Sequence, residues 1–139
     1  FLYQNRLTKN VVLVEIKTPV TRLLGGKYRV RSYSISDELS GAIAQVLSYR
    51  QTLLNEFSQL YVESRGGFEA SPPQCVVIIG NTGELDDPIK AGSFESFRSC
   101  LSGVTVLTYD ELLGKINDLI GILTTGDGKT RTDFDDHPF

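Results

Sequence analysis

The chain has 139 residues, of which 40% are hydrophobic and 22% charged, and its formal net charge is -3. A chain of this length can form one domain with a substantial buried core. The small negative charge excludes a general positive field that attracts nucleic acid, so any such binding needs a local basic patch. The sequence shows no signal peptide and no apolar stretch of the length that a membrane-spanning helix needs.

The first predicted elements are two strands over residues 1–5 and 11–17, joined by a connection of hairpin length. The second strand reads Val11-Val12-Leu13-Val14-Glu15-Ile16-Lys17, an apolar run that predicts burial on both faces. Because residues two apart on a strand point to the same side, Glu15 and Lys17 are expected to project together near its end. A charge in such a place is costly unless it is paired or holds an ion.

The next segment, residues 20–35, is basic and contains no acid. Its Gly25-Gly26 pair favours an ordered loop, with a short strand over 28–33. The basic residues of this segment are Arg22, Lys27, Arg29 and Arg31. A solvated loop and a set of phosphate contacts explain these cations equally well.

A long helix is predicted to follow Ser36, which is a good N-cap, and to end at Gly66-Gly67. Its apolar residues recur at intervals of three and four, as expected for a buried stripe: Leu39, Ile43, Val46, Leu53, Phe57 and Leu60. Gln45 and Tyr49 lie four residues apart and therefore share a face beside that stripe. Taken alone, they are better explained as a helix-surface pair than as a functional site.

The second half of the chain alternates between predicted strands and helices. We expect buried strands over 75–79 and 104–107, a polar excursion over 81–92, and helices over 93–101 and 110–123. Strands that alternate with helices predict an α/β sandwich with a central mixed sheet flanked by helices, formed by residues 1–123. Residues 124–139 are predicted to be a flexible tail or linker. Cys75 and Cys100 are expected to be buried free thiols in a reducing compartment.

Three further features are better explained by structure or solvation than by a functional site. Gly80-Asn81-Thr82-Gly83 lacks both the dinucleotide-binding glycine pattern and the phosphate-loop lysine, so it predicts a plain strand-exit turn. The only histidine, His137, lies in the polar tail, which argues against histidine-based catalysis and against a zinc site. The tail acids are expected to be solvated: Asp133, Asp135 and Asp136.

The order of these motifs resembles the RecB-like branch of the PD-(D/E)XK nucleases, in which Glu-x-Lys on a strand precedes Gln-x-x-x-Tyr on a helix. Longer stretches resemble the Shedu family of bacterial anti-phage defence proteins over residues 1 to about 123. They are Val-Glu-Ile-Lys-Thr-Pro at 14–19, Glu-Leu-Ser-Gly-Ala-Ile-Ala-Gln-Val-Leu-Ser-Tyr-Arg at 38–50, Ile-Ile-Gly-Asn at 78–81, Ser-Phe-Glu-Ser-Phe-Arg-Ser-Cys-Leu at 93–101 and Val-Thr-Val-Leu-Thr-Tyr-Asp-Glu-Leu-Leu at 104–113.

The resemblance implies a PD-(D/E)XK sandwich that acts as a Mg²⁺-dependent DNA endonuclease in the bacterial cytoplasm, with Mn²⁺ as a substitute metal. Glu15 and the Ile16 carbonyl would hold the metal, and Lys17 would orient the attacking water or stabilise negative charge. Gln45 and Tyr49 would position the DNA strand or a metal-bound water. The residues implied to grip backbone phosphates are Arg22, Lys27, Arg29, Arg31 and Arg50.

One departure from the family pattern concerns the metal. The pattern requires an aspartate upstream of Glu15, yet residues 1–14 contain no acid. The chain has no methionine and opens within a predicted strand, so we interpret it as a fragment and expect this aspartate immediately before Phe1. The alternative is a site that has lost a ligand and binds without cutting. Taken alone, Glu15 and Lys17 are better explained as a salt bridge at a strand end.

Two alternatives therefore stand beside the nuclease. The first is a catalytically silent module of the same fold that binds nucleic-acid ends or a partner chain. The second is an interaction domain whose long helix builds a homo-oligomer through Phe57, Leu60 and Tyr61. The resemblance to Shedu proteins also implies a homo-oligomer.

Overall fold

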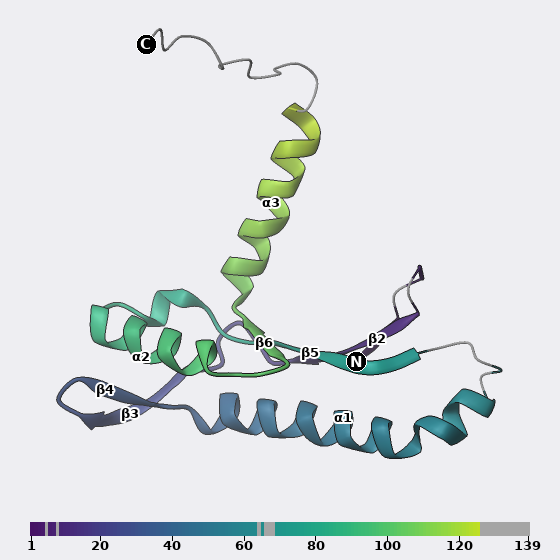
Figure 1. Ribbon diagram of the computed structural model, residues 1–139. Helices are drawn as coiled ribbons and strands as arrows, with labels where there is room; N and C mark the ends of the chain where they lie inside the picture. Colours follow the sequence, from purple (N-terminus) through teal and green to yellow (C-terminus); the bar gives the residue numbers. More distant parts are fainter. Residues whose placement is uncertain (5, 8, 64, 66–68, 126–139) are drawn as a thin grey trace, which may run out of the picture.

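The computed structural model describes residues 1–4, 6, 7, 9–63, 65 and 69–125, apart from the side chains of Leu60 and residues 69–72. Its central sheet has four strands in the order β1-β2-β5-β6 (Figure 1). Strand β1 (Leu2–Gln4) pairs antiparallel with β2 (Asn10–Ile16), and β5 (Glu69–Ile78) and β6 (Val104–Leu107) run parallel to β2. The predicted α/β architecture with a mixed central sheet is therefore confirmed.

Helix α1 (Asp37–Glu63) lies along one face of this sheet and makes the connection that parallel strands require (Figure 1). Leu13 of β2 stands beside Cys75 of β5, and both are buried with Val46 of α1. The Cys75 thiol points at the Val46 carbonyl, 3.9 Å away. Burial raises the pKa of the Cys75 thiol, so this cysteine is a neutral core residue, as predicted.

The opposite face of the sheet is less covered than the apolar run of β2 predicts. Val12 and Val14 are only half-buried, and Ile16 is 42% exposed. Helix α1 packs on the face that carries Val11 and Leu13. Helix α3 (Tyr109–Thr125) leaves the sheet at its edge and projects away from it (Figure 1). The prediction that both faces of β2 are buried is therefore wrong for the part of the chain that the structure describes.

The basic segment forms a β-hairpin, not the loop with one strand that the sequence predicts. Strands β3 (Leu24–Arg29) and β4 (Ser32–Ile35) pair antiparallel, and the turn at Val30-Arg31 divides the predicted strand over 28–33 in two. Leu23 and Leu24 are buried in the core and anchor the hairpin. Its other end extends beyond the sheet, alongside α2 (Figure 1).

Helix α2 (Pro88–Ser99) begins five residues before the predicted start, after a short 3₁₀ turn η1 (Thr82–Glu84). The Asp87 carboxylate accepts hydrogen bonds from the backbone N–H groups of Ile89 (2.7 Å) and Lys90 (3.0 Å), which caps the helix. The prediction of a polar excursion as far as Gly92 is therefore wrong. Cys100 follows the helix as its C-cap and is exposed, so the prediction of a second buried thiol is also wrong.

Helix α3 carries the largest set of exposed apolar side chains in the described part of the chain. Besides Ile122, they recur at intervals of three and four: Leu113, Ile116, Leu119, Ile120 and Leu123. The predicted oligomer surface late in α1 is smaller, because Phe57 packs against the core and contacts the ring of Tyr61. The side chain of Leu60 lies outside the described residues. Among the described residues, no helix has the length and apolarity that crossing a membrane demands.

Two predictions fall where the structure gives no description. The predicted helix end at Gly66-Gly67 lies outside the described residues, although α1 itself is described as far as Glu63. The predicted tail begins at Thr124, and α3 includes both Thr124 and Thr125. The remainder, 126–139, with His137 and the three tail aspartates, lies outside the described residues.

Gly80, which follows β5, occupies a backbone conformation that other residues avoid. Its φ is +63°, and an added Cβ would lie 2.6 Å from the Thr21 carbonyl oxygen and 2.8 Å from Leu23 Cδ2. We expect Gly80→Ala to lower the free energy of unfolding by at least about 1–3 kcal/mol, measured by urea denaturation. The control is Gly114→Ala in α3, where nothing crowds the new Cβ and stability should rise by up to about 1 kcal/mol. Equal effects of the two variants would contradict this account of Gly80.

Candidate functional site at the carboxyl edge of the sheet

The three parallel strands end at one edge of the sheet, and main-chain hydrogen bonds join the segments that leave them. After β2, the Lys17 N–H donates to the Ile78 carbonyl at 2.9 Å, which extends the β2–β5 ladder by one residue. The Gly80 N–H donates to the Thr18 carbonyl at 3.1 Å, and the Tyr109 N–H donates to the Gly80 carbonyl at 3.1 Å. Side chains from three separate parts of the sequence are therefore held at a single edge.

Glu15 and Lys17 meet at this edge, as the alternation of strand side chains predicts. Lys17 Nζ lies 3.0 Å from Glu15 Oε1, and the side chains are 33% and 13% exposed, respectively. Glu15 continues the face of β2 that buries Val11 and Leu13, so it projects from the side of the sheet on which α1 packs. The Tyr109 hydroxyl donates to the Lys17 carbonyl at 2.7 Å and fixes the main chain of the lysine.

Gln45 and Tyr49 form the second pair that the sequence predicts. The Gln45 Nε2 amide donates to the Tyr49 hydroxyl at 2.8 Å, as their spacing of four on a helix permits. Both belong to α1, the helix that packs on the face from which Glu15 projects. The structure therefore brings Glu15 to Lys17 and Gln45 to Tyr49, on two elements that pack against each other.

The other carboxylates near this edge serve the fold. Glu84 accepts hydrogen bonds from the N–H groups of Leu23 (2.7 Å) and Leu24 (3.1 Å), which fastens the base of the hairpin. Asp87 caps α2, and Asp110 and Glu111 bind threonine and arginine groups. Glu15, by contrast, pairs among the described residues with the Lys17 ammonium group alone.

A metal at this edge would have Glu15 as a side-chain ligand. No group of three or more metal-ligating side chains occurs among the described residues. The Ile16 carbonyl would be a second oxygen ligand. Val14 exchanges main-chain hydrogen bonds with Phe1 of the β1 side and Lys17 donates toward β5, so Ile16 turns its carbonyl to the β1 side. Mg²⁺ keeps several waters and binds through one or two carboxylates with substrate phosphates, so these two oxygens fit it as a partial ligand set.

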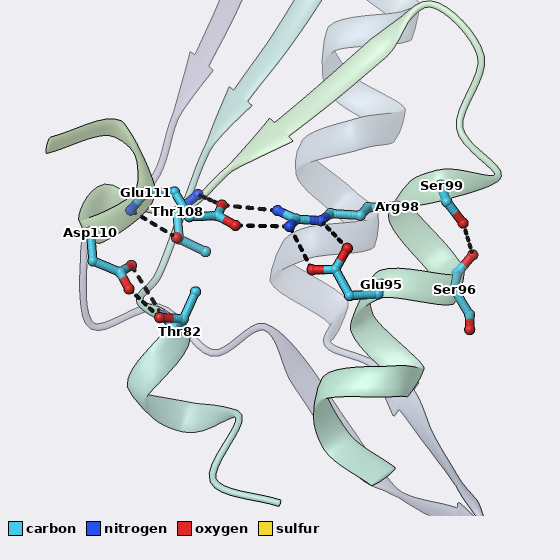
Figure 2. A network of polar contacts seen from close by, with 8 residues as sticks. All are labelled: Thr82, Glu95, Ser96, Arg98, Ser99, Thr108, Asp110 and Glu111. Atoms are coloured by element: carbon cyan, nitrogen blue, oxygen red, sulfur yellow. Dashed lines mark hydrogen bonds and ion pairs between the residues drawn. The ribbon is translucent and has the colours of Figure 1, made fainter. Parts of the chain in front are cut away.

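A polar network beside the site was not predicted from the sequence. Arg98 of α2 contacts Glu111 at 2.8 Å and Glu95 at 2.5 Å, as Figure 2 shows. Glu111 also accepts the Thr108 N–H at 3.1 Å, so the arginine joins α2 to the junction of β6 and α3. The hydrogen bond from Arg98 lowers the pKa of Glu111, against the opposing effect of burial. Arg98 and Glu111 are 13 residues apart, and the spacing of charged residues between α2 and α3 does not by itself predict that they pair.

Asp110 makes a second unpredicted contact, with the backbone N–H (3.1 Å) and hydroxyl of Thr82 (Figure 2). Burial opposes ionisation of Asp110, but the hydrogen bonds from Thr82 and Thr108 outweigh it and lower the pKa to about 2.

The low pKa of Asp110 predicts a loss of stability in acid. Since the unfolded chain binds this proton near pH about 4, the stabilisation is complete above that pH and disappears as the pH falls through about 2. We expect urea midpoints to fall over this window, and to fall less for Asp110→Asn, which keeps a hydrogen-bond acceptor. An identical pH dependence for both proteins would contradict the assignment.

The predicted phosphate-binding residues do not form one group. Lys27, Arg29 and Arg31 lie exposed on the β3–β4 hairpin. Arg22 lies at its base, with Nε 3.8 Å from Glu84. Arg50 is elsewhere: it lies against Gly103, which precedes β6 at the amino edge of the parallel strands. The structure therefore does not bring Arg50 to the hairpin.

Comparison with known proteins finds similarity to Shedu proteins over most of the chain. A family described as "Shedu protein SduA, C-terminal" matches residues 1–113. A curated relative, "Shedu protein SduA" of Bacillus cereus (strain B4264), is 43% identical over 129 residues, which cover 88% of this chain and 34% of the relative. The chain therefore spans about a third of the length of that relative. With the family matched over most of its residues, the chain belongs to the Shedu protein SduA C-terminal family.

Proposed function

We propose that this chain is the nuclease domain of a Shedu anti-phage defence protein and hydrolyses DNA phosphodiester bonds with the help of Mg²⁺. The observation that carries the proposal is the contact between Glu15 and Lys17, 3.0 Å apart at the end of a core strand. The helix that packs on that side of the sheet carries the Gln45–Tyr49 pair. Membership of the Shedu family supports the role in defence.

Each residue of the proposed site has a separate task. Glu15 and the Ile16 carbonyl would hold the metal, which when bound supplies a water of lowered pKa and neutralises charge at the phosphate. Lys17 presents its ammonium group where negative charge grows on the attacked phosphate. Tyr109 keeps the main chain of Lys17 in place. Gln45 and Tyr49 orient the DNA strand from the helix side.

The register of β1 and β2 indicates where the aspartate expected before Phe1 would lie. Leu2 stands opposite Leu13, and one step back along β1 corresponds to one step forward along β2. A residue that continues β1 immediately before Phe1 would therefore stand opposite Glu15, on the same face of the sheet. Because Val14 and Phe1 form the hydrogen-bonded pair, this next pair is a close, non-hydrogen-bonded one. An aspartate there could share one cation with Glu15.

The silent binding module is a second candidate, because the described residues contain no group of three or more side chains that could hold a metal. Both candidates are tested by incubating the full-length protein with plasmid DNA in Mg²⁺ and in chelator. Metal-dependent cleavage that Glu15→Gln abolishes supports the nuclease. Binding of DNA without cleavage under any metal would support the silent module instead.

The hairpin cations give the proposed DNA contact a measurable signature. No acidic side chain in the described part of the chain pairs with Lys27, Arg29 or Arg31. We expect replacing all three by alanine to reduce the slope of log affinity against log salt by about 3 for duplex DNA. The control removes equal charge from the distant, exposed Arg6, Lys9 and Arg65. Equal slopes for both triple variants would exclude the hairpin from the DNA contact.

A further inference from the structure

The tip of the β3–β4 hairpin exposes apolar side chains that the fold does not require. Tyr28 is 69% exposed and Val30 is 80% exposed. The turn at Val30-Arg31 contains no glycine, asparagine, aspartate or proline, the residues that usually form turns. Neither residue adopts a positive φ, so the backbone places no special demand on this position. These exposed side chains therefore have no evident structural role.

Cations lie between these apolar residues, and one of them contacts the tyrosine ring. The guanidinium carbon of Arg29 lies 5.2 Å from the centroid of the Tyr28 ring. Lys27 and Arg31 complete an alternation of basic with aromatic or apolar side chains from 27 to 31. Proteins that hold single-stranded nucleic acid combine such a positive surface with aromatic side chains on which bases stack.

The hairpin is held at its base, which follows the end of β2 in the chain, and its tip extends away from the sheet alongside α2 (Figure 1). Besides the two hydrogen bonds to Glu84, the Tyr33 N–H donates to Ser93 Oγ of α2 at 3.0 Å. Lys90 of α2 lies 5.8 Å from the centroid of the Tyr33 ring. The segment 18–23 connects this base directly to the end of β2, where Glu15 and Lys17 lie.

A polar hollow lies next to the tip. Its volume is about 350 Å³, and its lining includes Arg31 and the serines Ser32, Ser93 and Ser96. The Ser93 hydroxyl donates to the Ile89 carbonyl at 2.7 Å, which leaves Arg31 with the hydroxyls of Ser32 and Ser96 as donors of the kind that contact phosphate oxygens in nucleic-acid complexes. A nucleotide strand that crosses the tip therefore has both a stacking surface and a neighbouring polar recess.

We propose that the β3–β4 hairpin binds an unpaired stretch of DNA, with one base stacked on Tyr28 and the flanking phosphates held by Lys27, Arg29 and Arg31. Base faces are covered inside a duplex, and exposing them costs a few kcal/mol per step, whereas an unpaired base presents its face freely. The inference rests on the proposed function, because it assigns to the nuclease a substrate that contains single-stranded DNA.

The absence of tryptophan from the chain allows a direct test. Tyr28→Trp introduces a single fluorophore that can still stack. We expect its emission to be quenched by an oligothymidylate of about 12 nucleotides, a length within known single-strand site sizes, and not by duplex DNA bound to the same extent. The matched control is Tyr61→Trp near the far end of α1, which should show no quenching.

An affinity measurement provides the second readout. We expect Tyr28→Leu to weaken binding of the same oligothymidylate about fivefold to 100-fold, with Tyr28→Phe close to the parent chain. Duplex binding should change by less than about twofold. Binding without quenching, or equal loss on single-stranded and duplex DNA, would overturn the stacking site alone. Failure of the parent chain to bind either DNA would overturn the proposed function as well.

Discussion

Replacing Lys17 with alanine is expected to lower the rate of DNA cleavage by a factor of about 10²–10³. The lysine presents its charge 3.0 Å from Glu15, at the place where the proposed site would hold the attacked phosphate. A positive group placed before the reaction stabilises the transition state more than the bound substrate. The loss should therefore appear in the single-turnover cleavage rate at saturating Mg²⁺, with DNA affinity changed by less than about tenfold.

Two controls separate this chemical role from general effects of charge. Lys115→Ala removes an exposed lysine from α3 and should leave the cleavage rate unchanged. Lys17→Arg keeps the charge but changes its shape and donor geometry, so partial activity is expected. If Lys17→Ala cleaves as fast as the parent protein, Lys17 takes no part in the reaction and the proposed site is wrong.

Replacing Phe94 with alanine is expected to lower the free energy of unfolding by about 3–5 kcal/mol, a large share of the stability of a domain of this size. Phe94 is fully buried and is the only buried residue of α2, with the Arg98 guanidinium 4.9 Å from the centroid of its ring. Its removal leaves a cavity where α2 meets the core. Urea denaturation followed by far-UV circular dichroism measures the effect.

The neighbouring Phe97 gives the matched control, because it lies on the same helix but is only half-buried. Phe97→Ala should cost clearly less than Phe94→Ala. Since Ser93 and Lys90 of α2 support the hairpin, Phe94→Ala should also speed amide exchange at Tyr33. A loss below about 1 kcal/mol for Phe94→Ala would show that α2 is not anchored through this ring.

Local periodicity was enough to predict the two side-chain pairs of the candidate site. The two-residue repeat of a strand placed Glu15 beside Lys17, and the four-residue spacing on a helix placed Gln45 beside Tyr49. The start of α2 could also have been found, because Asp87 followed by Pro88 is a recognised helix-start signal. The hairpin was missed because its turn at Val30-Arg31 lacks turn residues and Gly25-Gly26 indicated a loop.

The remaining features depend on contacts between residues far apart in sequence. Glu84 and Leu23 are 61 residues apart, and Tyr109 and Lys17 are 92 apart. Nothing in the local pattern around Glu84 distinguishes a carboxylate that fastens a hairpin from one that is solvated. Cys100 was predicted to be buried because cysteine usually is, but its position after the last turn of α2 leaves it exposed.

The first residue of α3 contacts the proposed reaction centre, while the rest of the helix projects from the sheet. That residue, Tyr109, donates a hydrogen bond from its hydroxyl to the Lys17 carbonyl and another from its N–H to the Gly80 carbonyl. The rest of the helix extends outward with its leucines and isoleucines uncovered (Figure 1). A force applied far along α3 would therefore reach the main chain at Lys17 and Thr18 through the two hydrogen bonds of Tyr109.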